Sequence, residues 1–233
     1  MKAVLTKSIL SFALICIVAV APAGATLIDR GSFNDGFGGS VNLIYDTDLD
    51  ITWLGDANFA KTSGFITDGL MNWTTANAWA ASLTVGGFTN WRLPTTTQPD
   101  ASCSNQSIQS GFPDQGVAYG CTGNEMGHLF YEELGGTAGS SILSRVNPNL
   151  ALFSNIQSLI YWSGTEFAPN TIFAWTFYFV GGPQGTGGKN FPSNGAWAVR
   201  SGDVSPVPEP GTMLLLGSGL VGLIGYRMKK EGA

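Results

Sequence analysis

An apolar segment lies at each end of this 233-residue chain, and the two segments confine the folding unit to the residues between them. The first follows the positive charges of Lys2 and Lys7, runs from Ser8 to Val20, and ends in small residues up to Ala25. This order is typical of a secretory signal peptide. We therefore expect residues 1–25 to be a signal peptide that is cleaved after Ala25.

The second apolar segment, residues 213–226, is short for a membrane anchor. As a helix with a rise of about 1.5 Å per residue it would span roughly 21 Å, less than the about 30 Å of a hydrocarbon core. Arg227, Lys229 and Lys230 follow it and would stay on the cytoplasmic side. We expect this tail to associate only transiently with the inner membrane.

A short motif stands before that apolar run: Val207, Pro208, Glu209 and Pro210. The order of Pro-Glu-Pro, Gly-rich apolar run and basic cluster resembles the PEP-CTERM sorting signal of exopolysaccharide-producing Gram-negative bacteria. The resemblance implies an exosortase-type membrane protease as partner, removal of the tail, and delivery to the cell surface or extracellular matrix. Residues 204–206 are then a linker, and residues 207–233 are the sorting signal.

The part between the two tags, residues 26–205, is acidic and has the length of one domain. It contains six basic and 14 acidic residues, which give a formal charge of −8. Because such a surface repels polyanions, we expect no nucleic-acid partner.

Cys103 and Cys121 are the cysteines that remain once Cys16 leaves with the signal peptide. In an oxidising compartment the simplest expectation is a disulfide between them. In the chain-entropy model such a bridge contributes about 3 kcal/mol. The alternative, a metal held by both thiols, lacks partners because the chain has one His and no C-x-x-C motif.

Residue periodicity predicts strands with two helices among them, and therefore an α+β fold with antiparallel pairing. One helix is expected to begin after the N-cap Asn72 and to stop at Gly86 and Gly87. The other is expected over residues 125–134, behind a capping box that starts at Thr122. The Gly-rich residues 181–188 are predicted to be a flexible hairpin loop. The runs expected as strands are 41–46, 50–54, 90–95, 158–163, 171–180 and 196–200.

The run from Asp46 to Asp50 has the spacing of the start of a calcium loop, but the rest of that pattern fails. Ile51 and Ala57 stand where such a loop needs Gly and Glu. We predict no metal and no other cofactor. Calcium bound in another way stays open, with three candidate ligands: Asp46, Asp48 and Asp56.

The sequence contains no recognisable catalytic constellation. His128 is the only His, and no G-x-S-x-G motif accompanies it. Glu125 and Glu166 are the carboxylates considered for a glycosidase pair, but nothing in the sequence brings them together. We therefore predict a protein that is not an enzyme, with a glycan-modifying hydrolase as the less favoured alternative.

Several segments stand in an order that resembles the Lcl-type C-terminal domain, an extracellular domain of unknown function. The most specific of them are Trp-Arg-Leu-Pro-Thr at 91–95 and Tyr-Trp-Ser at 161–163. That family is similar to C-type lectin-like and sulfatase-modifying-factor folds. For residues 26–203 the resemblance implies two helices with a twisted antiparallel β-sheet. The copper chemistry of the formylglycine-generating relatives does not carry over, because the two cysteines here are too far apart in sequence.

The founding member of that family is associated with adhesion to glycans, so the resemblance implies a module that binds extracellular polysaccharide. Aromatic faces suit sugar rings, and polar side chains suit sugar hydroxyls. A structural matrix component that self-associates through exposed aromatic residues is the alternative. The candidate ligand-binding residues are Trp91, Arg92, Glu125, Trp162 and Glu166.

Overall fold

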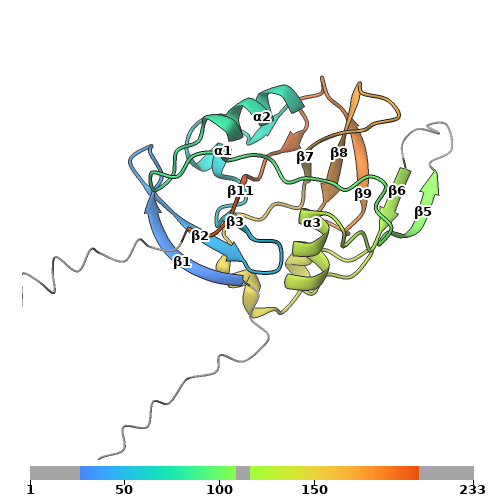
Figure 1. The fold of residues 1–233 in the computed structure, drawn as a ribbon, viewed down its shortest axis with the longest axis horizontal. Coiled ribbons are helices and arrows are strands. Elements are labelled where there is room, and N and C mark those ends of the chain that lie inside the picture. Colours follow the sequence, from blue (N-terminus) through green and yellow to red (C-terminus); the bar gives the residue numbers. More distant parts are fainter. Residues whose placement is uncertain (1–26, 109–115, 205–233) are drawn as a thin grey trace, which may run out of the picture.

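Two mainly antiparallel β-sheets form the framework of the computed structural model, which describes residues 27–108 and 116–204 (Figure 1). The predicted signal peptide with its Ala25 cleavage site, and the sorting signal of residues 207–233, lie outside the described residues. Among the helices of the described ranges, none has the length and apolar character needed to cross a membrane.

The smaller sheet brings the two ends of the domain together. Arg30 on its first strand donates two hydrogen bonds to the Asp203 carboxylate, at 2.8 and 2.5 Å, and so ties the start of the domain to its end. The second and third strands are the hairpin that the sequence predicts. In sheet order the strands are β1 (Leu27–Asn34), β2 (Ser40–Asp46), β3 (Ile51–Leu54) and β11 (Val199–Ser201).

The larger sheet has the order β4-β10-β7-β8-β9-β6-β5, and only its β10–β7 pair is parallel. The pairing of β7 with β8 confirms two predicted strands. The strands in chain order are β4 (Leu70–Met71), β5 (Ser104–Ile108), β6 (Gly116–Tyr119), β7 (Ile160–Glu166), β8 (Phe173–Tyr178), β9 (Gln184–Gly188) and β10 (Asn194–Gly195).

Strand β9 corrects the prediction that residues 181–188 are only a loop. Residues 184–188 pair with β8 in continuous register, from Phe173 opposite Gly188 to Phe177 opposite Gln184. A Cβ at Gly187 would lie 3.0 Å from the ring of the buried Trp162, a tighter contact than most side chains make. The glycines therefore allow a close approach of the strand to a large side chain.

Helix α2 (Trp73–Ser82) begins as predicted and ends earlier. The Asn72 side chain accepts a hydrogen bond from Thr75 N at 2.8 Å, which confirms the N-cap. The helix stops before Gly86 because Leu83 turns to an extended conformation and buries its side chain in the core. The strand predicted at 90–95 is reduced to a single bridge between Arg92 and Val199.

The second predicted helix is an α-turn followed by a π-helix. The α-turn is α3 (Glu125–His128), and the π-helix is η1 (Leu129–Glu133). The predicted capping box is wrong, because Asn124 rather than Thr122 caps α3 and accepts from Gly127 N at 2.7 Å. The remaining short helices are α1 (Phe59–Thr62), η2 (Ile142–Ser144) and η3 (Pro148–Leu152). The fold is thus mixed, with two sheets and few helices.

Trp197 joins the two sheets at the centre of the core. It lies in the link from β10 to β11, and its indole N–H donates to Leu54 O at 2.7 Å. Its ring contacts Trp53 of the smaller sheet at 5.3 Å between ring centroids, and Tyr161 of the larger sheet at 5.8 Å. The Trp53 pair is edge-to-face and the Tyr161 pair is tilted, and aromatic pairs of this kind stabilise the fold beyond the burial of their area.

We expect Trp197→Ala to lower the free energy of unfolding by about 3–5 kcal/mol, because it opens a cavity between the two sheets. Trp175→Ala is the matched control, since that indole is partly exposed, and it should lower stability by only about 1 kcal/mol. Urea unfolding of the full chain measures both changes. Equal losses would show that Trp197 does not connect the sheets.

Candidate functional site

A cleft of about 360 Å³ opens beside the disulfide, at the end of the larger sheet that carries β6, β8 and β9. Its volume lies within the range of about 300–1,000 Å³ that is typical of small-molecule sites. The lining is mostly apolar with a few polar groups, as in such sites. The lining includes the side chains of Gln98, Asp100, Phe167, Trp175 and Gln184.

Trp175 forms the aromatic wall of the cleft. Along β8, Phe177 and the Phe179 that follows are buried in the core, while Trp175 remains partly exposed. Phe167 packs edge-to-face against it, with ring centroids 5.1 Å apart. The row of alternating aromatic residues that the sequence predicts therefore passes from the core to the surface, and its outer part carries the exposed indole.

Gln98 fixes the orientation of that indole. Its Oε1 accepts a hydrogen bond from Trp175 Nε1 at 2.9 Å and another from Ala168 N at 3.1 Å. Its Nε2 donates to the backbone oxygen of Glu166 at 2.9 Å. One amide thus holds together the segment before the disulfide, the loop after β7, and the aromatic wall.

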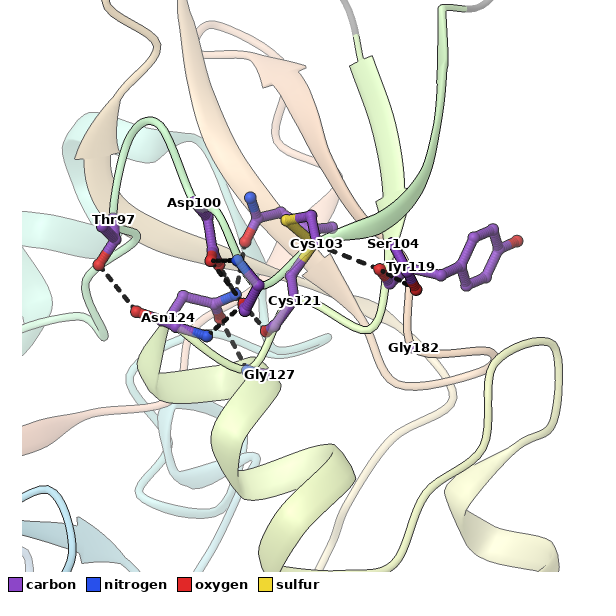
Figure 2. The surroundings of a disulfide bond; sticks show 12 residues. Thr97, Asp100, Cys103, Ser104, Tyr119, Cys121, Asn124, Gly127 and Gly182 are labelled. Carbon is purple, nitrogen blue, oxygen red and sulfur yellow. Dashed lines mark hydrogen bonds between the residues drawn. A yellow bond between two sulfur atoms is a disulfide. The ribbon is translucent and has the colours of Figure 1, made fainter.

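The floor of the cleft is a buried polar network around Asn124 (Figure 2). Asn124 Nδ2 donates to Gln184 Oε1 at 2.6 Å and to Cys121 O at 2.7 Å. Asp100 Oδ1 accepts from the backbone N and the Oγ of Ser102, at 3.0 and 2.5 Å. Because these partners satisfy one another, the polar groups are held in place before any ligand arrives.

The predicted disulfide between Cys103 and Cys121 is present and borders this network (Figure 2). Helix α3 packs directly against the backbone of the second cysteine. A Cβ placed on Gly127 would lie 1.7 Å from Cys121 O, so only glycine fits there. The disulfide and the start of α3 therefore form one unit beneath the cleft.

Arg92 and Glu125 come together, but as an ion pair outside the cleft lining. The guanidinium donates to both carboxylate oxygens, each at 2.7 Å, and Glu125 Oε2 also accepts from Thr95 N at 2.7 Å. Such a bidentate pair fixes geometry as well as adding stability. It clamps the 90–95 segment to α3.

Trp91 and Trp162 lie inside the core, with exposed fractions of 2% and 0%. Their indole N–H groups donate to backbone oxygens of Phe88 and Met71, at 3.0 and 2.8 Å. Neither ring offers a face to a ligand in this structure. Glu166 is exposed, does not belong to the cleft lining, and its carboxylate pairs with Lys189.

The cleft residues Gln98, Phe167, Trp175 and Gln184 are absent from the candidates predicted from sequence. In residues 171–180 an aromatic residue stands at every second position from Phe173 to Phe179, and this pattern places Trp175 in a row of aromatic side chains on one face of a strand. The two glutamines stand in no motif, and the fold alone brings them to one cleft.

Two groups of side chains with metal-ligating atoms occur in the described residues. One consists of Asp100, Cys103 and Cys121. Its sulfurs are joined in the disulfide, so they do not offer the thiolates that metal ions bind. The other consists of Asp46, His128 and Glu133. Of the three calcium candidates, Asp46 belongs to the second group, whereas Asp48 and Asp56 belong to neither.

Two family profiles match the chain, one over the folded domain and one over its C-terminal tail. The profile of the PEP-CTERM protein-sorting motif matches residues 206–230, so the chain is an exported protein of the class that exosortases sort. The profile of the Lcl C-terminal domain matches residues 42–200, and the chain belongs to that family, as the sequence predicts. Neither the curated proteins nor the solved structures contain a significant match. The C-type lectin-like fold therefore stays a prediction.

We expect Gly127→Ala to lower the free energy of unfolding by about 1–3 kcal/mol, because the added methyl group overlaps Cys121 O. Gly185→Ala is the control, since the nearest atom to its added Cβ is Thr176 Oγ1 at an ordinary 3.7 Å. Thermal unfolding of both variants of the full chain measures the difference. An unchanged melting temperature for Gly127→Ala would contradict the close contact between α3 and the disulfide.

Proposed function

We propose that this exported protein is a non-enzymatic polysaccharide-binding component of the cell surface or extracellular matrix, and that a sugar ring binds in the cleft beside Trp175. One observation carries the proposal. A partly exposed indole lines a 360 Å³ cleft together with fixed carboxylate and amide groups.

The chemistry of the cleft suits a neutral, hydroxyl-rich ligand. The indole face offers apolar contact for the C–H face of a pyranose ring, while Asp100 and Gln184 supply polar atoms for hydroxyls. Gln98 holds the indole in position through the 2.9 Å hydrogen bond, so little conformational entropy is lost on binding.

The arrangement of the carboxylates supports binding rather than hydrolysis. A glycosidase needs two carboxyl groups that flank the scissile bond. In the described part of the chain, Asp100 is the one acidic residue that lines the cleft. Glu125 is held by Arg92, and Glu166 by Lys189, in separate ion pairs.

Trp175→Ala should weaken binding of the host's exopolysaccharide at least about tenfold, a change of roughly 1.4 kcal/mol in binding free energy. Trp175→Phe should recover part of the loss, because a smaller aromatic face remains. Phe191→Ala is the control, since this side chain is 67% exposed and lies outside the cleft lining. Glycan arrays and titration of purified polysaccharide with the full chain measure the affinities.

Absence of binding by the unmodified chain above a heat-denatured sample would overturn the proposal. Equal losses in Trp175→Ala and Phe191→Ala would favour the self-association alternative. That alternative has its own support in the exposed Ile172 and Phe191, at 65% and 67% exposure. Light scattering over a range of protein concentrations separates the two, because self-association raises the apparent mass.

A further inference from the structure

A second polar cluster, between the β2–β3 turn and η1, contains buried atoms that lack hydrogen-bond partners. Asp46 is fully buried, and its Oδ1 accepts from Asp48 N and Leu49 N, both at 3.1 Å. Neither its Oδ2 nor the buried Nε2 of His128 makes a hydrogen bond of regular geometry. The neighbours they do have are the Trp53 indole for the Asp46 carboxylate and Glu133 Oε1, at 3.4 Å, for His128 Nε2. Leaving a buried polar atom unsatisfied costs about 1–3 kcal/mol. Two such atoms in one cluster point to a ligand that satisfies both.

The geometry of the cluster fits a single shared ion. Asp46, His128 and Glu133 each offer one ligand atom, and these atoms lie within 4.8 Å of one another. His128 Nε2 is 3.4 Å from Glu133 Oε1. Two ligands that are each about 2.1 Å from a tetrahedral ion lie about 3.4 Å apart. The His128–Glu133 separation is therefore that of two ligands on one metal.

The π-helix explains why these two side chains meet. In an α-helix the side chains that face each other are three or four residues apart, whereas Glu133 follows His128 by five. The wider turn of η1, closed by the hydrogen bond from Leu134 N to Leu129 O at 2.9 Å, brings a residue five positions later onto the same face. Such π-turns occur frequently at functional sites.

Outer contacts hold the end of this turn in place. The backbone oxygen of Glu133 accepts from Asn149 Nδ2 at 2.9 Å and from Asn147 Nδ2 at 3.3 Å. Asp48, with half of its side chain exposed, lies 3.9 Å from His128 Nε2 and marks the side of the cluster that faces solvent. The end of the turn that carries Glu133 is thus fixed by its surroundings.

We propose that Asp46, His128 and Glu133 bind a divalent transition-metal ion. One imidazole nitrogen with two carboxylate oxygens suits zinc and its first-row neighbours, whereas calcium and magnesium prefer ligand sets of oxygen alone. The dication also balances the two carboxylate charges. This site is separate from the proposed polysaccharide cleft and does not depend on it.

The competing arrangement is a protonated His128 between the carboxylates, with no metal. The neighbouring Glu133 carboxylate raises the pKa of His128 above its ordinary value, although burial of the ring opposes this. A proton and a metal ion cannot share Nε2, so direct detection of a metal–imidazole bond distinguishes the two arrangements.

Zinc binding to the metal-free full chain, purified without a polyhistidine tag, is the first test. We expect one zinc ion per chain by elemental analysis after dialysis. Glu133→Gln should lower the zinc affinity at least about tenfold in calorimetric titration. Glu132→Gln is the matched control, because it removes the same charge from the adjacent, exposed position and should leave the affinity unchanged.

Pulsed electron paramagnetic resonance of the unmodified chain with bound Cu²⁺ is the second test, and it needs no substitution. Because the whole chain has one His, coupling to an imidazole nitrogen identifies His128 as a ligand. The proposal fails if the chain binds no zinc, if Glu132→Gln and Glu133→Gln weaken binding equally, or if bound copper shows no imidazole coupling. Binding of calcium but not zinc would also overturn it.

Discussion

The packing of Trp197 between the two sheets is the contact on which the rest of the structure depends. The three residues between β10 and β11 carry the chain from the larger sheet to the smaller one, and Trp197 stands in the middle of that link. Its N–H bond to Leu54 and its ring contacts with Trp53 and Tyr161 fix how the sheets meet. Because the link also leads into the strand that closes the smaller sheet, the two ends of the domain are brought together at the same time. The outer strands and loops, which carry both proposed sites, are built on this shared core.

The α3–η1 segment connects the two proposed sites, although it is only nine residues long. At its start, Asn124 belongs to the floor of the cleft and Glu125 clamps the 90–95 segment. At its end, His128 and Glu133 form part of the unsatisfied cluster. Its irregular geometry has physical causes. The backbone of Cys121 lies so close to the start of α3 that only glycine fits at position 127. The π-turn then places Glu133, five positions after His128, beside it.

The features that could be predicted from sequence are those with local causes. The cap at Asn72, the hairpin before Leu54 and the Cys103–Cys121 bridge each follow from residues near in sequence or from the oxidising compartment. Strand β9 could not be predicted, because glycine has little strand preference of its own, and its role is to admit Trp162 from a distant segment. The sequence likewise does not indicate which of the seven tryptophans are exposed. Five of them are fully buried in the structure. Gln98 and Gln184 lie far apart in the chain, and only the folded arrangement of a loop beside β8 and β9 brings them to one cleft.

The two sites differ in how their polar atoms are satisfied, and this difference indicates the kind of ligand that each one suits. In the cleft, Gln98, Asn124 and Gln184 already hydrogen-bond within the protein, and the surface they present is a fixed indole with polar borders. That arrangement favours a neutral ligand that gains from shape and apolar contact. In the cluster, Asp46 Oδ2 and His128 Nε2 are buried without a hydrogen bond of regular geometry, so the protein alone leaves an electrostatic cost there. A cation would remove that cost. The proposed binding of a polymer at the surface and the proposed binding of an ion in the interior therefore rest on separate physical grounds.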